Sequence, residues 1–230
     1  MEDAALFDLL SWMSPAWPIG GFAYSGGIEW AVEAGHVTTR ASAQEWILAM
    51  LEEGSLWNEA VIFTHSWRAA QGRDVVRMTE VAQLAAASLT SAERRLESTA
   101  QGAAFRRIAS VATPAATLET LKGVEDGELA YPVVVGALAA GRGIAARPAL
   151  MAWLHAAVAN FVSAALRLVP LGQTDGQIIL AAMKPHILAL AQRAVALPDD
   201  DPFMAMASAT PLADFATMAH ETQYTRLFRT

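Results

Sequence analysis

The chain has 230 residues, of which 54% are hydrophobic and 17% are charged, and it carries no cysteine and a formal net charge of −7. The length predicts one or two domains and allows a hydrophobic core without cross-links. The absence of cysteine excludes disulfides, thiolate nucleophiles and cysteine-bound metal clusters, and the acidic balance argues against a dedicated nucleic-acid-binding protein. The low charged fraction has two explanations: alanine inflates the hydrophobic share, or part of the surface is covered by another chain.

The N-terminus and the longest uncharged stretch bear on secretion and membrane insertion. Met1, Glu2 and Asp3 precede the first apolar residues, without the basic region of a secretory signal. Residues 149–166 carry no charge and reach the ~18 residues of a membrane helix, but alanine dominates them and His155 lies among them. We therefore expect a cytoplasmic protein in which 149–166 is a core helix and His155 is hydrogen-bonded in the core.

Strong helix formers dominate the chain, and no stretch alternates apolar and polar residues long enough to predict a strand. Thr90 and Glu93 have the spacing of a capping box, Gly54 is a point at which the third helix can break, and Pro185 is expected to kink or split its helix. The predicted helices span residues 4–12, 24–34, 41–70, 73–88, 91–112, 114–122, 132–140, 148–169, 175–196 and 211–224.

Two irregular segments interrupt these helices, at 14–21 and at 198–202. Neither divides the chain into two cores, because the helices on each side are amphipathic or apolar and need one another for burial. We predict an all-α, single-domain bundle of about ten helices over 1–217, followed by a polar C-terminal tail at 218–230.

The sequence contains no recognisable catalytic or metal-binding pattern. A P-loop, a nucleophile elbow and an HExxH motif are all missing, and no two of the five histidines have i, i+4 spacing. The acidic residues 199–201 are expected to form a hydrated turn, and Arg94, Arg95, Arg106 and Arg107 to be solvated on helix faces. These observations favour a non-enzymatic binding protein without a metal or cofactor site, with an all-α regulator that binds a small ligand as the alternative.

The segment 14–30, SPAWPIGGFAYSGGIEW, is unusual for a connection between helices. Its two prolines restrict the backbone, and its paired glycines permit positive φ. Its aromatic side chains offer a large contact area, and Glu29 is its only charge. Two interpretations stay open: a tight helix connection plugged by aromatic side chains, or an interaction surface or channel mouth.

The C-terminal segment 218–230, MAHETQYTRLFRT, is rich in aromatic and basic residues. Tyr224, Leu227 and Phe228 have i, i+3, i+4 spacing and would share one face if the segment were helical. Two arginines flank them. A tail of this composition is expected to fold onto a partner.

Five blocks, in order from one end of the chain to the other, resemble the urease accessory protein F (UreF) family. The blocks are 14–25 with Glu29, Gln101-Gly102, 131–136, 167–177 and 220–229. The chain departs from the family pattern at Gly26, where the family carries a polar residue, so a side-chain role at that position is in doubt.

The resemblance implies an all-α, usually dimeric protein without enzymatic activity or cofactor. It implies a complex with the accessory protein UreD, also called UreH, which recruits the GTPase UreG to the urease apoprotein for nickel delivery and lysine carbamylation. Neither nucleic acid nor a membrane is an expected partner. The expected partner-binding residues are Pro15, Pro18, Gly20, Gly21, Phe22, Tyr24, Ser25, Glu29, Pro170, Gly172, Gln173, Gln177, His220, Glu221, Tyr224, Arg226, Leu227, Phe228 and Arg229.

Overall fold

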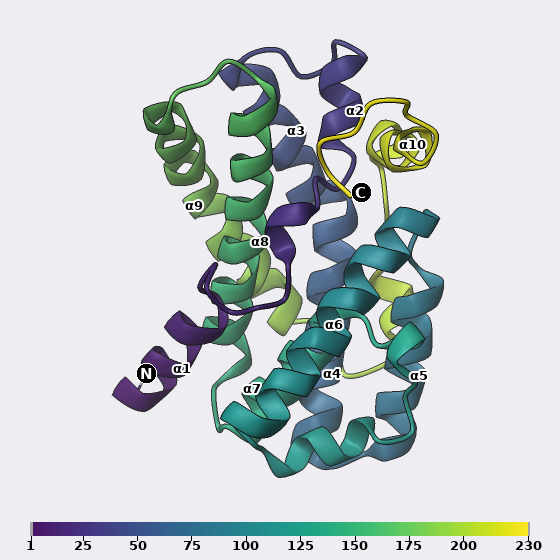
Figure 1. The fold of residues 1–230 in the computed structure, drawn as a ribbon. Helices are drawn as coiled ribbons and strands as arrows, with labels where there is room; N and C mark the ends of the chain where they lie inside the picture. Colours follow the sequence, from purple (N-terminus) through teal and green to yellow (C-terminus); the bar gives the residue numbers. More distant parts are fainter. Residues whose placement is uncertain (1, 230) are drawn as a thin grey trace.

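The computed structural model describes residues 2–229, and within them it contains ten α-helices, four short 3₁₀ helices and no β-strand (Figure 1). The α-helices are α1 (Asp3–Trp12), α2 (Ile28–Glu33), α3 (Arg40–Glu53), α4 (Ser55–Gly72), α5 (Val75–Ala87), α6 (Ala92–Ala112), α7 (Tyr131–Gly141), α8 (Ala146–Leu168), α9 (Gln173–Val195) and α10 (Pro211–His220). The 3₁₀ helices are η1 (Gly21–Ala23), η2 (Ala116–Leu121), η3 (Asp126–Glu128) and η4 (Pro202–Ala205). The prediction of an all-α bundle of about ten helices is confirmed.

The differences from the predicted helices have identifiable structural causes. The stretch 41–70 divides into α3 and α4 at Gly54, where a Cβ would lie 2.6 Å from the Thr210 hydroxyl oxygen. The cap of α6 is Ser91 and not Thr90, because the Ser91 hydroxyl accepts the Arg94 N–H at 3.1 Å. Helix α9 continues through Pro185 and is not split.

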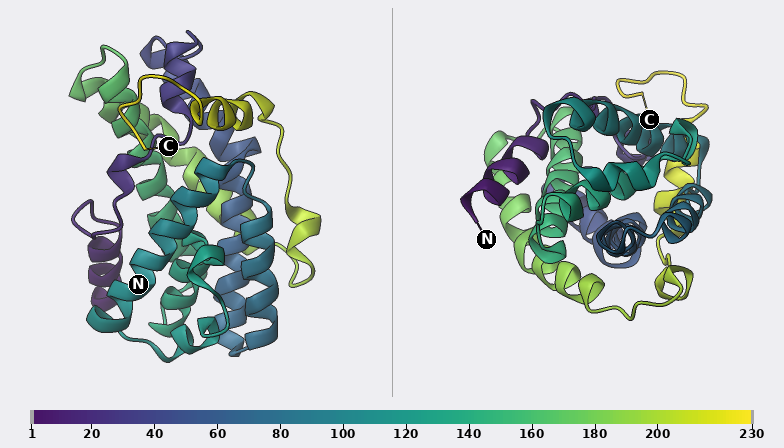
Figure 2. Two further views of the ribbon diagram at one scale, coloured as in Figure 1. Left: turned by 45° about the vertical axis from the view of Figure 1, so that its right-hand side comes forward. Right: turned by 90° about the horizontal axis from the view of Figure 1, so that it is seen from below.

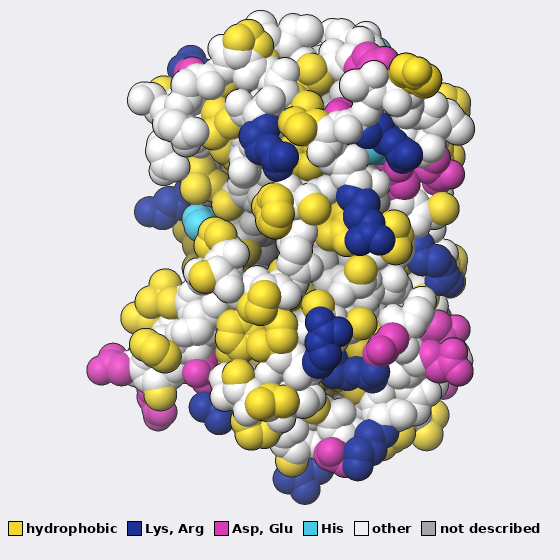
Figure 3. Space-filling view, in the orientation of Figure 1, with side chains coloured by type: hydrophobic (Ala, Val, Ile, Leu, Met, Phe, Trp, Pro, Cys, Tyr) yellow, Lys and Arg dark blue, Asp and Glu magenta, His cyan; other side chains and the backbone are white. Residues whose placement is uncertain are grey.

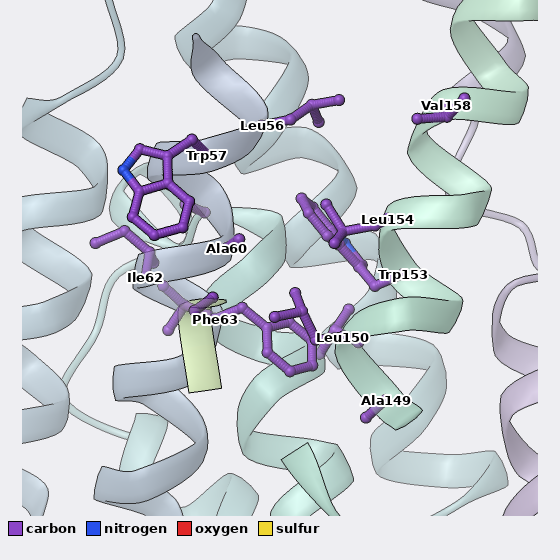
Figure 4. Packing of buried hydrophobic residues seen from close by; sticks show 14 of the residues in the cluster. Leu56, Trp57, Ala60, Ile62, Phe63, Ala149, Leu150, Trp153, Leu154 and Val158 are labelled. Atoms are coloured by element: carbon purple, nitrogen blue, oxygen red, sulfur yellow. The ribbon is translucent and has the colours of Figure 1, made fainter. Parts of the chain in front are cut away.

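Helix α4 lies at the centre of the bundle and packs against α7, α8, α3, α5 and α9. Figure 4 shows Phe63 of α4 facing Leu150 and Trp153 of α8, and the Phe63 and Trp153 ring centroids are 6.1 Å apart. Helix α7 approaches α4 so closely that a Cβ at Gly136 would lie 2.7 Å from the Phe63 carbonyl oxygen. The core therefore depends on a small residue at this crossing as well as on large apolar ones.

Helices α8 and α9 are both long and apolar enough to cross a membrane by length and composition alone. Half of the apolar window of α8 is buried inside the protein, where Leu150, Trp153 and Leu154 pack into the core. The predicted core helix at 149–166 is thus confirmed. The prediction that His155 lies in the core is wrong, because this residue is exposed.

Parts of the two unusual segments, 14–30 and 218–230, lie at the same end of the bundle. Helix α2, helix α10, the C-terminal residues and the connection between α8 and α9 all lie at the upper end in Figure 1 and in the left view of Figure 2, whereas α1 lies against the side. The predicted boundary between 217 and 218 falls inside α10, and the residues beyond it that are not helical are 221–229, here called the tail. Met1 and Thr230, the outer ends of the two predicted ranges, lie outside the described residues.

Candidate functional site

The connection between α1 and η1 packs aromatic side chains inward while its turns stay near the surface. Trp12 and Trp17 both contact Phe105 of α6, with ring centroids 6.3 and 5.6 Å apart from it. Gly20 adopts φ +75°, which lets the chain turn into η1. Phe22 is left 72% exposed. The segment is therefore a plugged helix connection that also presents an apolar side chain to solvent.

The same connection forms one wall of a cavity of about 700 Å³, whose other walls are α8 and α6. Three tryptophans line it, Trp12, Trp17 and Trp153, and their indole nitrogens are buried without a hydrogen-bond partner. Buried indole N–H groups normally find an acceptor. The aromatic part of the lining thus includes three buried indole donors without an acceptor.

A buried ion cluster closes the polar side of the cavity. The Arg94 guanidinium donates to Glu59 at 2.7 Å and to Glu97 at 2.6 Å, and all three residues line the cavity. Burial raises the pKa of the Glu59 carboxyl, while Arg94 acts in the opposite direction. The expectation that Arg94 is solvated on a helix face is wrong, because this side chain is buried between two carboxylates.

The tail is not helical, so its three large side chains do not share a helical face. Helix α10 ends at His220, and 221–229 run back over the bundle as turns and bends. Phe228 is buried, whereas Tyr224 is fully exposed and Leu227 is 58% exposed. The tail therefore separates into one anchored side chain and two that face outward.

Two contacts hold the end of the tail against η1 and α8. The Arg229 N–H donates to the Ala23 carbonyl at 2.8 Å. The Arg167 guanidinium lies 4.1 Å from the centroid of the Phe228 ring and also donates to the Phe22 carbonyl at 2.8 Å. One arginine of α8 thereby joins the 14–30 segment to the tail.

Glu29 receives the tail through backbone hydrogen bonds. Its carboxylate accepts the Leu227 N–H at 2.5 Å and the Phe228 N–H at 2.9 Å. The same carboxylate lies 3.0 Å from Nε2 of His220. The burial of the Glu29 carboxylate is therefore compensated by its partners, which are two backbone N–H groups of a non-helical segment and one ring nitrogen.

Glu93 of α6 completes this cluster from the opposite side. It lies 2.8 Å from Nδ1 of His220 and 3.3 Å from the Arg226 guanidinium. Burial raises the pKa of the Glu93 carboxyl, while His220 and then Arg226 act to lower it. We call Glu29, His220, Glu93 and Arg226 the tail cluster.

Local backbone geometry puts Glu29 in the first turn of α2. Gly26 and Gly27 adopt φ +59° and +87°, so the predicted helix at 24–34 begins only at Ile28. A Cβ at Gly27 would lie 2.9 Å from the Thr217 methyl carbon of α10. The close approach of α2 to α10 brings Glu29 within reach of His220.

The structure brings some of the expected partner-binding residues together and leaves others apart. Glu29, His220, Arg226, Leu227 and Phe228 form one connected cluster, which Arg229 joins through the Ala23 carbonyl. Glu221 accepts the Ala92 N–H at the start of α6. Tyr24 and Ser25 are buried, Gly21 is half-buried, and the exposed remainder is Pro15, Pro18, Gly20, Phe22, Pro170, Gly172, Gln173, Gln177 and Tyr224.

Three charged residues of these sites were missed in the sequence. The sequence indicates Glu93 only as part of a helix cap and Arg167 only as the first residue of the 167–177 block, and it gives no signal for Glu59. Glu93 has i, i+4 spacing with Glu97 and Gln101 and shares a buried face of α6 with them, but this spacing does not identify a partner 127 residues away.

Comparison with known proteins assigns the chain to a family. The family model for UreF matches residues 37–184. The chain is 47% identical over 228 residues to the urease accessory protein UreF of Rhodopseudomonas palustris (strain BisB5), covering 99% of this chain and 92% of that protein. It is 48% identical over 229 residues to that of Bradyrhizobium sp. (strain BTAi1 / ATCC BAA-1182), covering 100% of this chain and 93% of the relative. The chain therefore belongs to the UreF family of urease accessory proteins.

Proposed function

We propose that the chain is a non-catalytic, cytoplasmic adaptor in urease maturation. It binds UreD (UreH) through the tail and recruits or regulates the GTPase UreG on the urease apoprotein, where nickel is the cargo. The observation that carries this proposal is the docked tail, which is anchored by Phe228 and the Glu29 carboxylate and presents Tyr224 and Leu227 to solvent. Family membership supports the link to urease.

The docked tail suits a partner surface for an energetic reason. Ordering a flexible segment at the moment of binding lowers affinity, and a segment already held in place avoids that loss. Exposed aromatic and aliphatic side chains on a fixed backbone are typical centres of an interface. Tyr224 and Leu227 are therefore the proposed contacts with UreD, and Phe228 is the proposed internal anchor.

Deletion of the tail tests the proposal. The variant lacking 221–230 keeps α10 intact, so we expect its helical circular dichroism to match that of the full chain. Tagged UreD co-expressed with the variant should no longer retain it, while the full chain co-purifies. A Phe203→Ser variant, which alters an exposed side chain of η4, is the matched control and should still co-purify. Retention of the deletion variant by UreD would contradict the assignment.

A homodimer is part of the proposal, and α1 is its proposed surface. Leu6, Phe7 and Leu10 have i, i+1, i+4 spacing on α1 and are 43%, 70% and 65% exposed. Figure 3 shows hydrophobic side chains gathered over α1 at the lower left of the molecule. A Phe7→Ser, Leu10→Ser double variant should lower the mass measured by light scattering from that of a dimer to that of a monomer. An unchanged dimer mass would exclude α1 as the surface.

The cavity beside the 14–22 connection is the proposed passage for nickel through this chain. Its carboxylates Glu59 and Glu97 are already paired with Arg94, which suits transit better than storage. Ala156→Trp should fill the cavity and reduce urease activation while UreD binding persists. The control is Ala112→Trp at an exposed position of α6. Full activation by the filled variant would remove the passage from the proposal.

The cavity also favours the alternative function, a regulator that binds a small ligand. Three unused indole donors would suit a molecule with hydrogen-bond acceptors. Mass spectrometry of the chain purified under native conditions and then denatured tests this. A stoichiometric small molecule that Ala156→Trp displaces would favour the alternative, and its absence favours the adaptor.

A further inference from the structure

His220 lies between two buried carboxylates and contacts both with its two ring nitrogens. Nε2 is 3.0 Å from a Glu29 oxygen, and Nδ1 is 2.8 Å from a Glu93 oxygen. The imidazole is fully buried, and Glu29 and Glu93 are 6% and 7% exposed. Water therefore has little access to these three side chains. Each contact between a ring nitrogen and a carboxylate oxygen needs a proton that one of the two groups carries.

Counting protons shows that the arrangement needs one more than its groups carry by themselves. A neutral imidazole has one N–H donor and one acceptor nitrogen, whereas ionised carboxylates only accept. Both contacts are hydrogen bonds only if the imidazole carries two protons or one carboxyl is protonated. Burial raises the pKa of the Glu93 carboxyl, so Glu93 is the carboxyl better able to hold the extra proton. The two contacts can therefore be hydrogen bonds at the same time only when an extra proton lies on His220 or on Glu93.

The charged groups that face His220 come from every element packed around it. Glu29 comes from α2, Glu93 from α6, Arg226 from the tail, and Glu221 follows it at the end of α10. With the extra proton present, one positive charge on the imidazole and one on Arg226 balance the two carboxylates of the tail cluster. Loss of the proton leaves a net negative buried cluster and sets an imidazole lone pair against a carboxylate oxygen.

The tail depends on the same atoms. The Glu29 oxygen that contacts His220 is also the acceptor for the Phe228 N–H at 2.9 Å, and its second oxygen accepts the Leu227 N–H at 2.5 Å. A shift of this carboxylate away from an unprotonated ring nitrogen would weaken both backbone hydrogen bonds. Arg226, which precedes Leu227 in the tail, contacts the other carboxylate, that of Glu93.

We propose that His220 is the positioning residue of the tail, and that the proton it shares with Glu93 holds the tail in its docked form, so that UreD binding weakens as this proton is lost. The proposal rests on the proposed function for the link to UreD alone. The sign follows from linkage: the docked state binds the additional proton, so its stability is complete at low pH and declines as pH rises through the loss of that proton. A difference of about one pKa unit between docked and undocked tail corresponds to about a tenfold change in docking.

The absence of cysteine allows a direct measurement. A Thr225→Cys variant, altered at an exposed tail position, carries a single fluorophore whose anisotropy reports tail mobility. Between pH 5.5 and 9 we expect anisotropy to fall in the otherwise unmodified chain as the tail loosens. An anisotropy that stays constant over this range would overturn the proposal, whatever UreD does.

Two variants separate the shared proton from a merely structural histidine. Glu93→Gln supplies an amide N–H to a neutral His220, so its tail should stay docked and lose the pH response. His220→Gln carries both of its N–H donors on one nitrogen, and its other polar atom is an acceptor oxygen, so it cannot replace two ring nitrogens that contact different carboxylates. Its tail should be mobile at every pH. A pH response that survives in Glu93→Gln would overturn the proposal, and His36→Gln, at an exposed histidine, is the control.

Parallel UreD titrations distinguish this inference from the proposed function. Affinity for UreD should fall about tenfold together with the anisotropy, and should not vary with pH in Glu93→Gln. An anisotropy response with pH-independent UreD affinity would overturn the link between docking and binding. An anisotropy response without UreD binding at any pH would overturn the proposed function and leave the role of the shared proton intact.

Discussion

At the scale of single residues, close packing requires glycine at a few helical positions, because the backbone of another segment lies directly against the helix there. Gly102 of α6 lies so close to the Leu129 carbonyl oxygen that a Cβ there would overlap it. Gly136 of α7 faces the Phe63 carbonyl in the same manner. Both glycines lie in blocks that resemble the UreF family, and both are explained by close packing without a role in binding.

Gly102→Ala should therefore lower the free energy of unfolding by about 2 kcal/mol or more, because backbone atoms cannot move aside as a side chain can. Urea unfolding followed by circular dichroism measures this. Gly123→Ala is the matched control, since a Cβ at Gly123 meets no atom within 4 Å. Equal stabilities of the two variants would show that α6 can shift away from Leu129.

Arg94 shows why the sequence did not reveal the buried charges. Its neighbours along α6 are polar, so the local pattern predicts a solvated face. Its partner Glu59 is 35 residues earlier in the chain, on α4. The same holds for His220 and Glu29, which are 191 residues apart, and no local pattern predicts such a contact.

At the scale of elements, sequence patterns predicted most of the helices because alanine-rich amphipathic segments and strong termination signals identify them. Helix ends were less well predicted where one hydroxyl competes with its neighbour, as Ser91 does with Thr90. The predicted last helix extends to residue 224, and the spacing of Tyr224, Leu227 and Phe228 would suit a helix beyond it. The tail amides bond instead to Glu29, a tertiary contact that overrides local propensity.

The connection after α9 is held to α4 and α5 by a second charged cluster. Asp199 pairs with Arg77 at 2.5 Å and with Arg68 at 3.5 Å, and Arg77 also contacts Nδ1 of His65 at 3.1 Å. The predicted acidic turn is thus tied to the bundle by Asp199. Burial, together with the neighbouring Arg68 and Arg77, lowers the pKa of His65 to about 4.

This cluster predicts an acid-sensitive stability. The folded pKa of His65 lies below its ordinary value, so the unfolded chain binds more protons and stability falls as pH drops from about 6.5 to 4. Asp199 acts in the same direction, because hydrogen bonding to Arg77 lowers its pKa. We expect the free energy of unfolding to fall by roughly 2 kcal/mol across this range.

Denaturant unfolding at a series of pH values checks this expectation. His65→Gln should reduce the slope between pH 6.5 and 4, whereas His36→Gln, at an exposed position, should leave it as in the unaltered chain. An identical slope in His65→Gln would assign the acid sensitivity to other groups.

At the scale of the whole molecule, one end of the bundle gathers α2, α10, the tail and the α8–α9 connection. The low charged fraction has a clearer meaning in this arrangement. Alanine accounts for much of the apolar content inside the helices, while exposed apolar side chains gather on α1, on α10 and on the tail. These are the two surfaces to which the proposed function assigns a second copy of the chain, on α1, and UreD, on the tail.

The central claim is that the tail acts through an internal anchor and an outward contact. Calorimetric titration of UreD into single variants, with the melting temperature measured in parallel, tests it most directly. We predict that Tyr224→Ala and Leu227→Ser each weaken UreD binding at least tenfold with an unchanged melting temperature, whereas Phe228→Ser weakens binding and also lowers the melting temperature. UreD binding that is unaffected by Tyr224→Ala, Leu227→Ser and Phe228→Ser would contradict the claim.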